Sequence, residues 1–303
     1  MSFAEKEKEV YSDMTYTEFF DITELAEEGR KSFCDLRDRE KDASFSDSVR
    51  ESFRQYEIGD EEFYKHLSDF ARREKIEIEV LNLYLYLKKS FETYIGLANK
   101  GIDGKILADT YKEFSKVSED NKKKTDIYGI PQEIQRRWLR RYVNGTIFRI
   151  GRLNFDIAKS DRDYEIDGYT LKKDEDCISV HIPDGGRLFD GECENSYAEA
   201  RSVFGKIFGM NPCFFVCYSW LLSPWLSEVL PRESLIVKFQ SRYKIVAFDE
   251  SAGDMLTHIY PVTYEEVKTK PIEEYSEDTT LRRMTKERMK RGEIIGYGTG
   301  IRL

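Results

Sequence analysis

The chain has 303 residues, of which 40% are hydrophobic, so it is long enough for about two domains with packed cores. Charged residues make up 35%, and the net charge of -9 with a pI near 5.2 argues against nucleic acid or an anionic membrane as the main partner. The N-terminal MSFAEKEKEV lacks the apolar stretch of a signal peptide, and no run of about eighteen apolar residues predicts a membrane span. With five cysteines and only three histidines, we expect a cytoplasmic protein with free thiols and no metal site.

Periodic apolar residues predict helices over the first third of the chain. Thr15 and Glu18 fit a capping box, and Asp60 is placed to cap a second helix. Residues 76–98 begin with a strand-like alternation, but their length and their lack of turn residues favour a buried helix. Asp103 then opens another helix. The simplest interpretation of this region is a helical packing domain without chemistry.

The charged stretch EDNKKKTD, residues 119–126, has few core residues and predicts a linker. It divides the chain into a helical N-terminal domain, 1–119, and a second domain, 120–303. The second domain begins with a helix that starts near Pro131 and ends at Asn144. Its arginines are expected to form a solvated or acid-paired face: Arg136, Arg137, Arg140 and Arg141.

From Thr146 the pattern changes to that of strands. Residues 146–158 are rich in β-forming residues, and Asp167-Gly168 is typical of a two-residue hairpin turn. Near the C-terminus the pattern predicts further elements: strands at 241–249 and 255–260, a polar loop at 261–278, a helix at 279–291, and a glycine-rich end that can form one short strand.

One stretch, residues 177–231, has the strand, glycine turn, helix and strand of a βαβ unit. A strand from Cys177 to Ile182 precedes PDGG, and an amphipathic helix follows from about Gly191 to Phe208. The next strand, Phe214 to Tyr218, is almost continuously apolar, as expected when both of its faces are covered. Such units bind ligands at the carboxyl end of the first strand, beside the N-terminus of the helix.

Five separated motifs can be compared with known families: GRLNF (151–155), VHIPDGG (180–186), CYSWLLSP (217–224), FQSR (239–242) and TLRR…GYGTGI (280–301). Together they resemble a two-part family of acyltransferases, in which a helical domain precedes a domain of the GNAT (Gcn5-related N-acyltransferase) type. The resemblance implies an α+β chain with a mixed GNAT-like sheet. It also implies transfer of an acyl group, acetyl in our prediction, from acyl-coenzyme A to a small-molecule or peptide amine. The oligomeric state is not predicted.

The resemblance also implies roles for particular residues. The strand end would bind the pantetheine arm and the following loop the pyrophosphate through amide N–H groups, with Arg187 adding charge. These cofactor-binding candidates are Val180, Ile182, Asp184, Gly185, Gly186 and Arg187. His181 is the candidate general base, Tyr218 the candidate acid toward the thiolate, and Ser219 completes the catalytic set at the end of the second strand.

Two other interpretations stay open. The usual GNAT pattern of a basic residue, two variable residues and Gly-x-Gly or Gly-x-Ala is absent, and Glu192 and Glu194 at the helix start would repel a pyrophosphate. These features favour a non-catalytic GNAT-like binding module that has lost coenzyme A binding. A weaker alternative is a cysteine-dependent hydrolase or transferase that uses Cys217 and His181.

Overall fold

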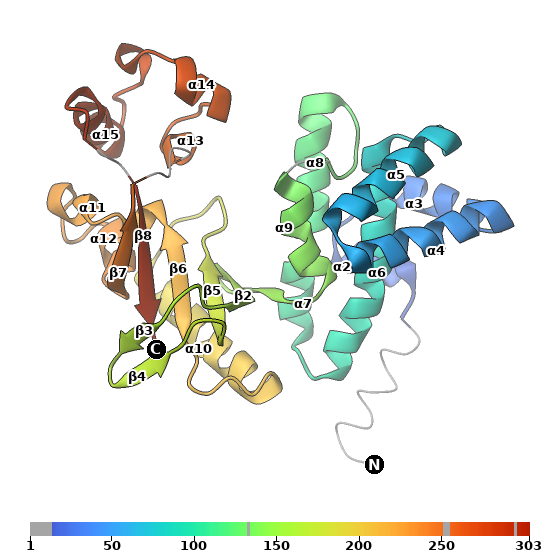
Figure 1. Cartoon of the computed structure of the whole chain (residues 1–303), viewed down its shortest axis with the longest axis horizontal. Coiled ribbons are helices and arrows are strands. Elements are labelled where there is room, and N and C mark those ends of the chain that lie inside the picture. The colour runs from blue at the N-terminus through green and yellow to red at the C-terminus, as the bar shows by residue number, and fades with distance from the viewer. Residues whose placement is uncertain (1–13, 132–133, 251–254, 294–295) are drawn as a thin grey trace. The chain divides into compact units, whose positions relative to one another are not determined.

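The computed structural model describes residues 14–131, 134–250, 255–293 and 296–303 (Figure 1). The expectation about a signal peptide therefore concerns residues that lie outside the described part. The chain divides into two compact units, Met1–Arg149 and Ile150–Leu303. Within the described ranges no helix combines the length and the apolar character that crossing a membrane requires.

The first unit is helical, as the periodicity predicts. Its helices are α2 (Tyr16–Ile22), α3 (Glu27–Arg39), α4 (Ala43–Ile58), α5 (Asp60–Glu74), α6 (Ile78–Asn99), α7 (Gly104–Tyr111), α8 (Glu113–Thr125) and α9 (Ile134–Val143). Thr15 and Glu18 form the predicted capping box, and Asp103 caps α7. Gly59, however, is the residue before α5, and Asp60 lies in its first turn, where it accepts a hydrogen bond from Arg140.

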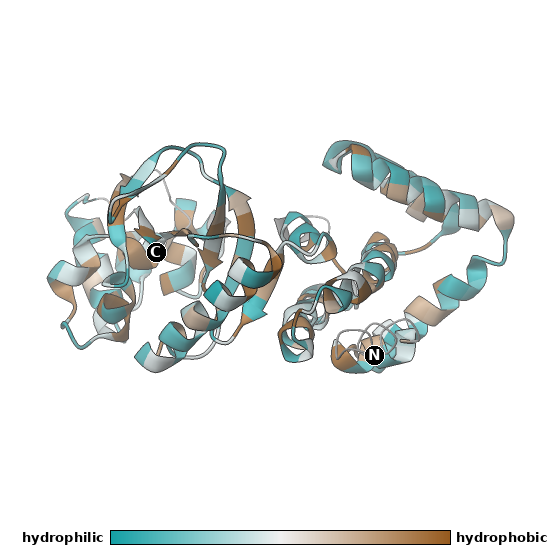
Figure 2. Ribbon diagram, turned by 90° about the horizontal axis from the view of Figure 1, so that it is seen from below, coloured by the Kyte–Doolittle hydropathy of each residue, from teal (hydrophilic) through white to brown (hydrophobic). Residues whose placement is uncertain are grey.

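Helix α6 forms the centre of this unit. It contacts α3, α5, α7, α8 and α9, and the seven residues from Leu81 to Leu87 are all buried. Burial on every side explains why the sequence of this helix lacks a clear polar face. The predicted helix over residues 76–98 is therefore confirmed. The surrounding helices mix hydrophilic and hydrophobic residues, as amphipathic packing requires (Figure 2).

The predicted linker at residues 119–126 was wrong. Residues 113–125 are helix α8, so the predicted boundary at 119 and 120 falls inside a helix, whereas the two units divide after Arg149. One face of α8 is buried through Phe114, Val117 and Asn121, and the Asn121 side chain donates to the Ile127 carbonyl. The charged residues lie on the other face, so high charge here marks a solvated helix face.

The second unit contains a six-stranded mixed sheet, whose strand β1 begins in the last residues of the first unit. The sheet has the order β1-β2-β5-β6-β8-β7, and a separate hairpin is formed by β3 and β4. The strands are β1 (Ile147–Ile150), β2 (Leu153–Lys159), β3 (Tyr164–Ile166), β4 (Tyr169–Leu171), β5 (Asp176–His181), β6 (Phe215–Ser219), β7 (Lys244–Asp249) and β8 (Tyr297–Arg302). Strands β5 and β6 are parallel, whereas β2–β5, β6–β8 and β7–β8 are antiparallel.

The predicted βαβ unit is confirmed as β5, α10 (Asp190–Ile207) and β6. Helix α10 covers one face of the sheet, where the Tyr197 ring packs against the rings of Phe155 and Phe215. The β3–β4 hairpin covers part of the opposite face. Its turn is the predicted Asp167-Gly168 pair, and both residues have positive φ, as a two-residue hairpin turn requires.

The glycine-rich end contains the predicted short strand, and this strand is an inner strand of the sheet. Strand β8 lies between β6 and β7. A Cβ at Gly298 would lie 2.0 Å from the carbonyl oxygen of Leu222, which belongs to the short helix η1 (Trp220–Leu222). A Cβ at Gly300 would lie 2.7 Å from that of Tyr243. Glycine is therefore needed in β8 for close packing.

Helices fill the connections around β6, β7 and β8. The short helices α11 (Trp225–Val229) and α12 (Leu235–Gln240) connect β6 to β7. Between β7 and β8 the chain leaves the sheet and forms α13 (Met255–Ile259), α14 (Tyr264–Thr269), η2 (Ile272–Glu274) and α15 (Thr280–Lys290). These elements lie at the end of the sheet where β7 ends and β8 begins (Figure 1).

Two predictions for the segment between β7 and β8 were wrong, although the predicted terminal helix is confirmed as α15. Residues 255–260 form helix α13 and no strand, because Met255 and Ile259 face one apolar cluster with Trp225 at helical spacing. The predicted loop at 261–278 contains α14, which begins with a capping box of Thr263 and Glu266.

Candidate functional site

Strands β5 and β6 part toward their carboxyl ends. They pair in parallel only at Ile178 with Phe215 and at Ser179 with Val216. Beyond these pairs, β5 continues for two residues that pair with β2, and β6 continues for three that pair with β8. The facing backbone edges beyond Ser179 are therefore not joined in register, and extended polar groups of a ligand can bind between them.

The register places the candidate residues on two different faces. Because Ser179 pairs with Val216, the alternation along each strand puts His181 and Tyr218 on one common face. Val180 and Cys217 lie on the other face, which α10 covers, and both are buried. The sheet thus brings His181 and Tyr218 to the face without α10, on either side of the parting strands.

His181 lies beside a buried carboxylate. Its Nε2 atom is 3.9 Å from Oδ2 of Asp156, which is on the neighbouring strand β2. The Asp156 side chain is only 8% exposed, whereas that of His181 is 31% exposed. At this distance the two side chains are neighbours without a direct hydrogen bond between them.

Tyr218 is half exposed, and Asp249 and Tyr297 are among its partners. Its hydroxyl donates a hydrogen bond of 2.7 Å to Oδ2 of Asp249, the last residue of β7. Its ring stacks on Tyr297, the first residue of β8, with 4.9 Å between ring centroids. The predicted acid thus has a carboxylate partner that the sequence analysis did not identify.

The loop after β5 is organised by Arg152. The guanidinium donates to the carbonyl oxygens of Pro183 (3.0 Å), Gly186 (3.1 Å) and Arg187 (3.2 Å). Gly185 and Gly186 both have positive φ, which fits the glycine requirement of this turn. With these carbonyls directed toward Arg152, the amide N–H groups of residues 184–187 donate to no group in the described part of the chain. The loop therefore offers several donors to an anion.

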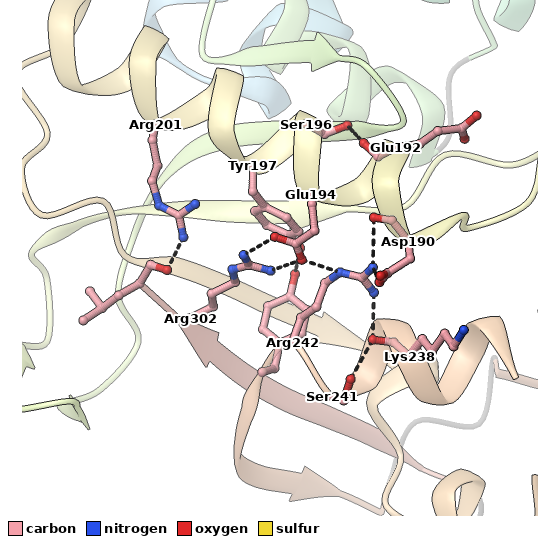
Figure 3. Close-up of polar contacts among 12 residues, drawn as sticks. Asp190, Glu192, Glu194, Ser196, Tyr197, Arg201, Lys238, Ser241, Arg242 and Arg302 are labelled. Atoms are coloured by element: carbon pink, nitrogen blue, oxygen red, sulfur yellow. Dashed lines mark hydrogen bonds and ion pairs between the residues drawn. The ribbon is translucent and has the colours of Figure 1, made fainter. Parts of the chain in front are cut away.

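The acidic residues at the start of α10 are largely neutralised (Figure 3). Glu194 accepts two hydrogen bonds from Arg302 and one from Arg242, and these bonds lower its pKa to about 2. Arg242 also pairs with Asp190, and its side chain is only 4% exposed. The predicted repulsion of a pyrophosphate by Glu194 is thus compensated, although Glu192 remains at the helix start.

Two other candidates have structural partners. Ser219 is buried and its hydroxyl accepts a hydrogen bond from the amide of Leu221, so it caps η1. Cys217 is fully buried, and burial raises the pKa of its thiol to about 12. Because Cys217 and His181 lie on opposite faces of the sheet, the cysteine-dependent alternative lacks its activating pair.

The sequence analysis missed three residues of this site. Arg152 and Arg242 lie in the motifs GRLNF and FQSR, so the signal was present, but their partners are distant in the sequence. Asp249 ends a strand and is 31 positions from Tyr218 in the sequence. No local sequence pattern could therefore connect the two residues.

The comparisons with known proteins agree with this architecture. Residues 147–302, just over half of the chain, match the family described as GNAT-like C-terminal domain, and the chain therefore belongs to that family. This confirms the resemblance and the predicted fold class. No curated protein matches the chain.

Several solved structures share the fold. One is an acyltransferase in complex with decanoyl-CoA and teicoplanin, with a TM-score of 0.59 and 21% identity. Others are an acyltransferase with CoA and 10C-teicoplanin and an acyltransferase mutant with octanoyl-CoA, both at the same TM-score and identity. Each match covers 74% of this chain and 66% of the other, which is slightly less than two thirds of the neighbours' length.

Proposed function

We propose that this chain transfers an acyl group from acyl-coenzyme A to an amine on a small molecule or peptide. The observation that carries the proposal is that β5 and β6 part beside the loop of residues 184–187. The backbone N–H groups of this loop donate to no group in the described part of the chain. The pantetheine arm would run along Val180 to Ile182. The pyrophosphate would bind the loop from Asp184 to Arg187, where Gly185 and Gly186 allow close approach of the backbone.

In this proposal the amine attacks the thioester directly. Amide groups at the strand ends would polarise the thioester carbonyl, since donors fixed in advance stabilise the developing oxyanion. Proton transfer would take place on the face without α10, where the side chains of His181 and Tyr218 lie. We leave Ser219 out of this route because its hydroxyl is engaged in the cap of η1.

The acyl chain needs its own test. The sequence analysis favoured acetyl, whereas the structural neighbours were crystallised with decanoyl-CoA and octanoyl-CoA. We therefore propose acyl-CoA as the donor class and compare short and medium chains. The same neighbours support teicoplanin as one amine-acceptor probe, next to simple primary amines.

Thermal shift and calorimetry with CoA, acetyl-CoA and decanoyl-CoA test the donor, and mass spectrometry of the acceptor probes tests transfer. Binding of a CoA species together with an acylated amine is the expected result. Absence of all CoA binding would overturn the proposal and favour the alternative, a non-catalytic binding module, which the missing Gly-x-Gly pattern and Glu192 support.

A further inference from the structure

Asp249 and Tyr218 form a polar pair at the free end of β6. The Tyr218 hydroxyl donates to Asp249 Oδ2 over 2.7 Å, and Tyr218 is 51% exposed. We infer that Asp249 is the base that accepts the proton of the attacking amine and that Tyr218 is the acid linked to it. This inference rests on the proposed acyl transfer and deepens it.

The position of the pair in the sheet fits this role. Tyr218 lies two residues beyond Val216, the last residue of β6 in register with β5. It is therefore on the parted section of β6, where a thioester bound between the strands would end. Its side chain lies on the same face of the sheet as that of His181.

Asp249 is a better base for the acceptor than Asp156. Asp156 is almost fully buried and lies 3.9 Å from His181, so it can hardly reach an incoming amine. Asp249 is only partly buried and shares its oxygen with an exposed phenol. In our inference the acceptor amine approaches this carboxylate beside the Tyr218 ring.

The pair is held by the surrounding structure. Asp249 pairs across the ladder with Tyr297, and the Tyr297 ring stacks on Tyr218. Tyr297 itself belongs to the apolar cluster that also contains Trp225 and Met255. Residues fixed by strands and by a packed aromatic keep catalytic groups in place without a cost of ordering at each turnover.

The proton balance closes with these two groups. The neutral amine attacks the thioester carbon, the C–N bond forms, and the ammonium proton of the adduct passes to the Asp249 carboxylate. The C–S bond then breaks, and Tyr218 gives its phenolic proton to the thiolate. Asp249 returns its proton to the phenolate along their hydrogen bond. The net change moves one proton from the amine to the thiol of coenzyme A, and no other reactant is needed.

The test uses the full chain with Asp249→Asn, Tyr218→Phe, the double variant and a control, Asp176→Asn. Asp176 is an exposed carboxylate at the other end of β5, paired with Lys159. Decanoyl-CoA and acetyl-CoA are the donors, and teicoplanin, glucosamine and spermidine are the acceptor probes. Release of free CoA thiol gives kcat and KM, and calorimetry gives the Kd of CoA.

We expect Asp249→Asn to lower kcat by about 100-fold or more, the usual range for loss of a general base, while the Kd of CoA stays within twofold. The double variant should lose little more than Asp249→Asn alone, because the two groups act on one proton route. Asp176→Asn should match the wild type.

The outcomes separate the inference from the proposed function. If no form of the protein binds CoA, the proposed function itself fails. If the wild type binds CoA but acylates none of the amines, the proposed transfer fails and the role of Asp249 fails with it. If the wild type acylates an amine and Asp249→Asn keeps the wild-type kcat, only the role of Asp249 is overturned. Additive losses in the double variant would likewise contradict a shared proton route.

Discussion

Arg152 offers a sharp test of the loop that is proposed to hold the pyrophosphate. Its guanidinium donates to three loop carbonyls, those of Pro183, Gly186 and Arg187. At about 1 kcal/mol for each hydrogen bond, these contacts hold the loop by about 3 kcal/mol. In Arg152→Lys the charge remains, but an ammonium on a flexible stem can satisfy about one of the three carbonyls. The ordered conformation of the loop is then less stable by about 2 kcal/mol.

If coenzyme A binds the ordered loop, part of the binding free energy in the variant is used to order the loop. A cost of about 2 kcal/mol should raise the Kd of CoA about 30-fold. Calorimetric titration of CoA measures this change, and circular dichroism checks that the sheet is intact. Arg162→Lys is the control, because Arg162 is exposed and pairs with its neighbour Asp161, outside the loop. An unchanged Kd in a folded Arg152→Lys protein would refute the assignment of the loop.

Two further predictions concern the same unit. Gly186→Val and Gly168→Val both place a β-branched residue at positive φ, +72° and +81° respectively, so each variant should be less stable by about 1–2 kcal/mol. Only Gly186→Val should also weaken CoA binding, by tenfold or more as measured by calorimetry. Equal CoA affinities in the two variants would contradict this. Glu194 has a folded pKa lowered from 4.5 to about 2, so its ionised form stabilises the fold above pH 4.5 and this contribution disappears as the pH falls toward 2. Denaturant unfolding of the wild type and Glu194→Gln should therefore differ at pH 6, modestly because the side chain is 46% exposed, and converge near pH 2; a constant difference would argue against the pair with Arg302.

Local sequence patterns predicted the elements that depend on residues close to one another in the chain. The capping box at Thr15, the hairpin turn at Asp167-Gly168 and the βαβ unit were confirmed because each depends on neighbouring residues. Helix α8 was missed because its exposed face is rich in charge while three small or polar residues, among them Asn121, contribute to its buried face.

Features that depend on distant contacts could not be predicted in the same way. A short strand was predicted in the glycine-rich end, but the need for Gly298 depends on Leu222, which packs directly against that strand. Tyr218 was identified at the end of its strand, but its partner Asp249 depends on the order of β6, β8 and β7. The role of Arg152 likewise depends on a loop about 31–35 positions away.

Hydrogen–deuterium exchange with and without saturating CoA tests the central claim most directly. Bound CoA should slow exchange of the backbone amides from Val180 to Arg187, because the pantetheine and pyrophosphate would take up their donors. Peptides from the β3–β4 hairpin and from helix α6 should exchange at the same rate in both states. Protection confined to other segments, or no protection at a CoA concentration that saturates binding, would contradict a cofactor site between β5 and β6.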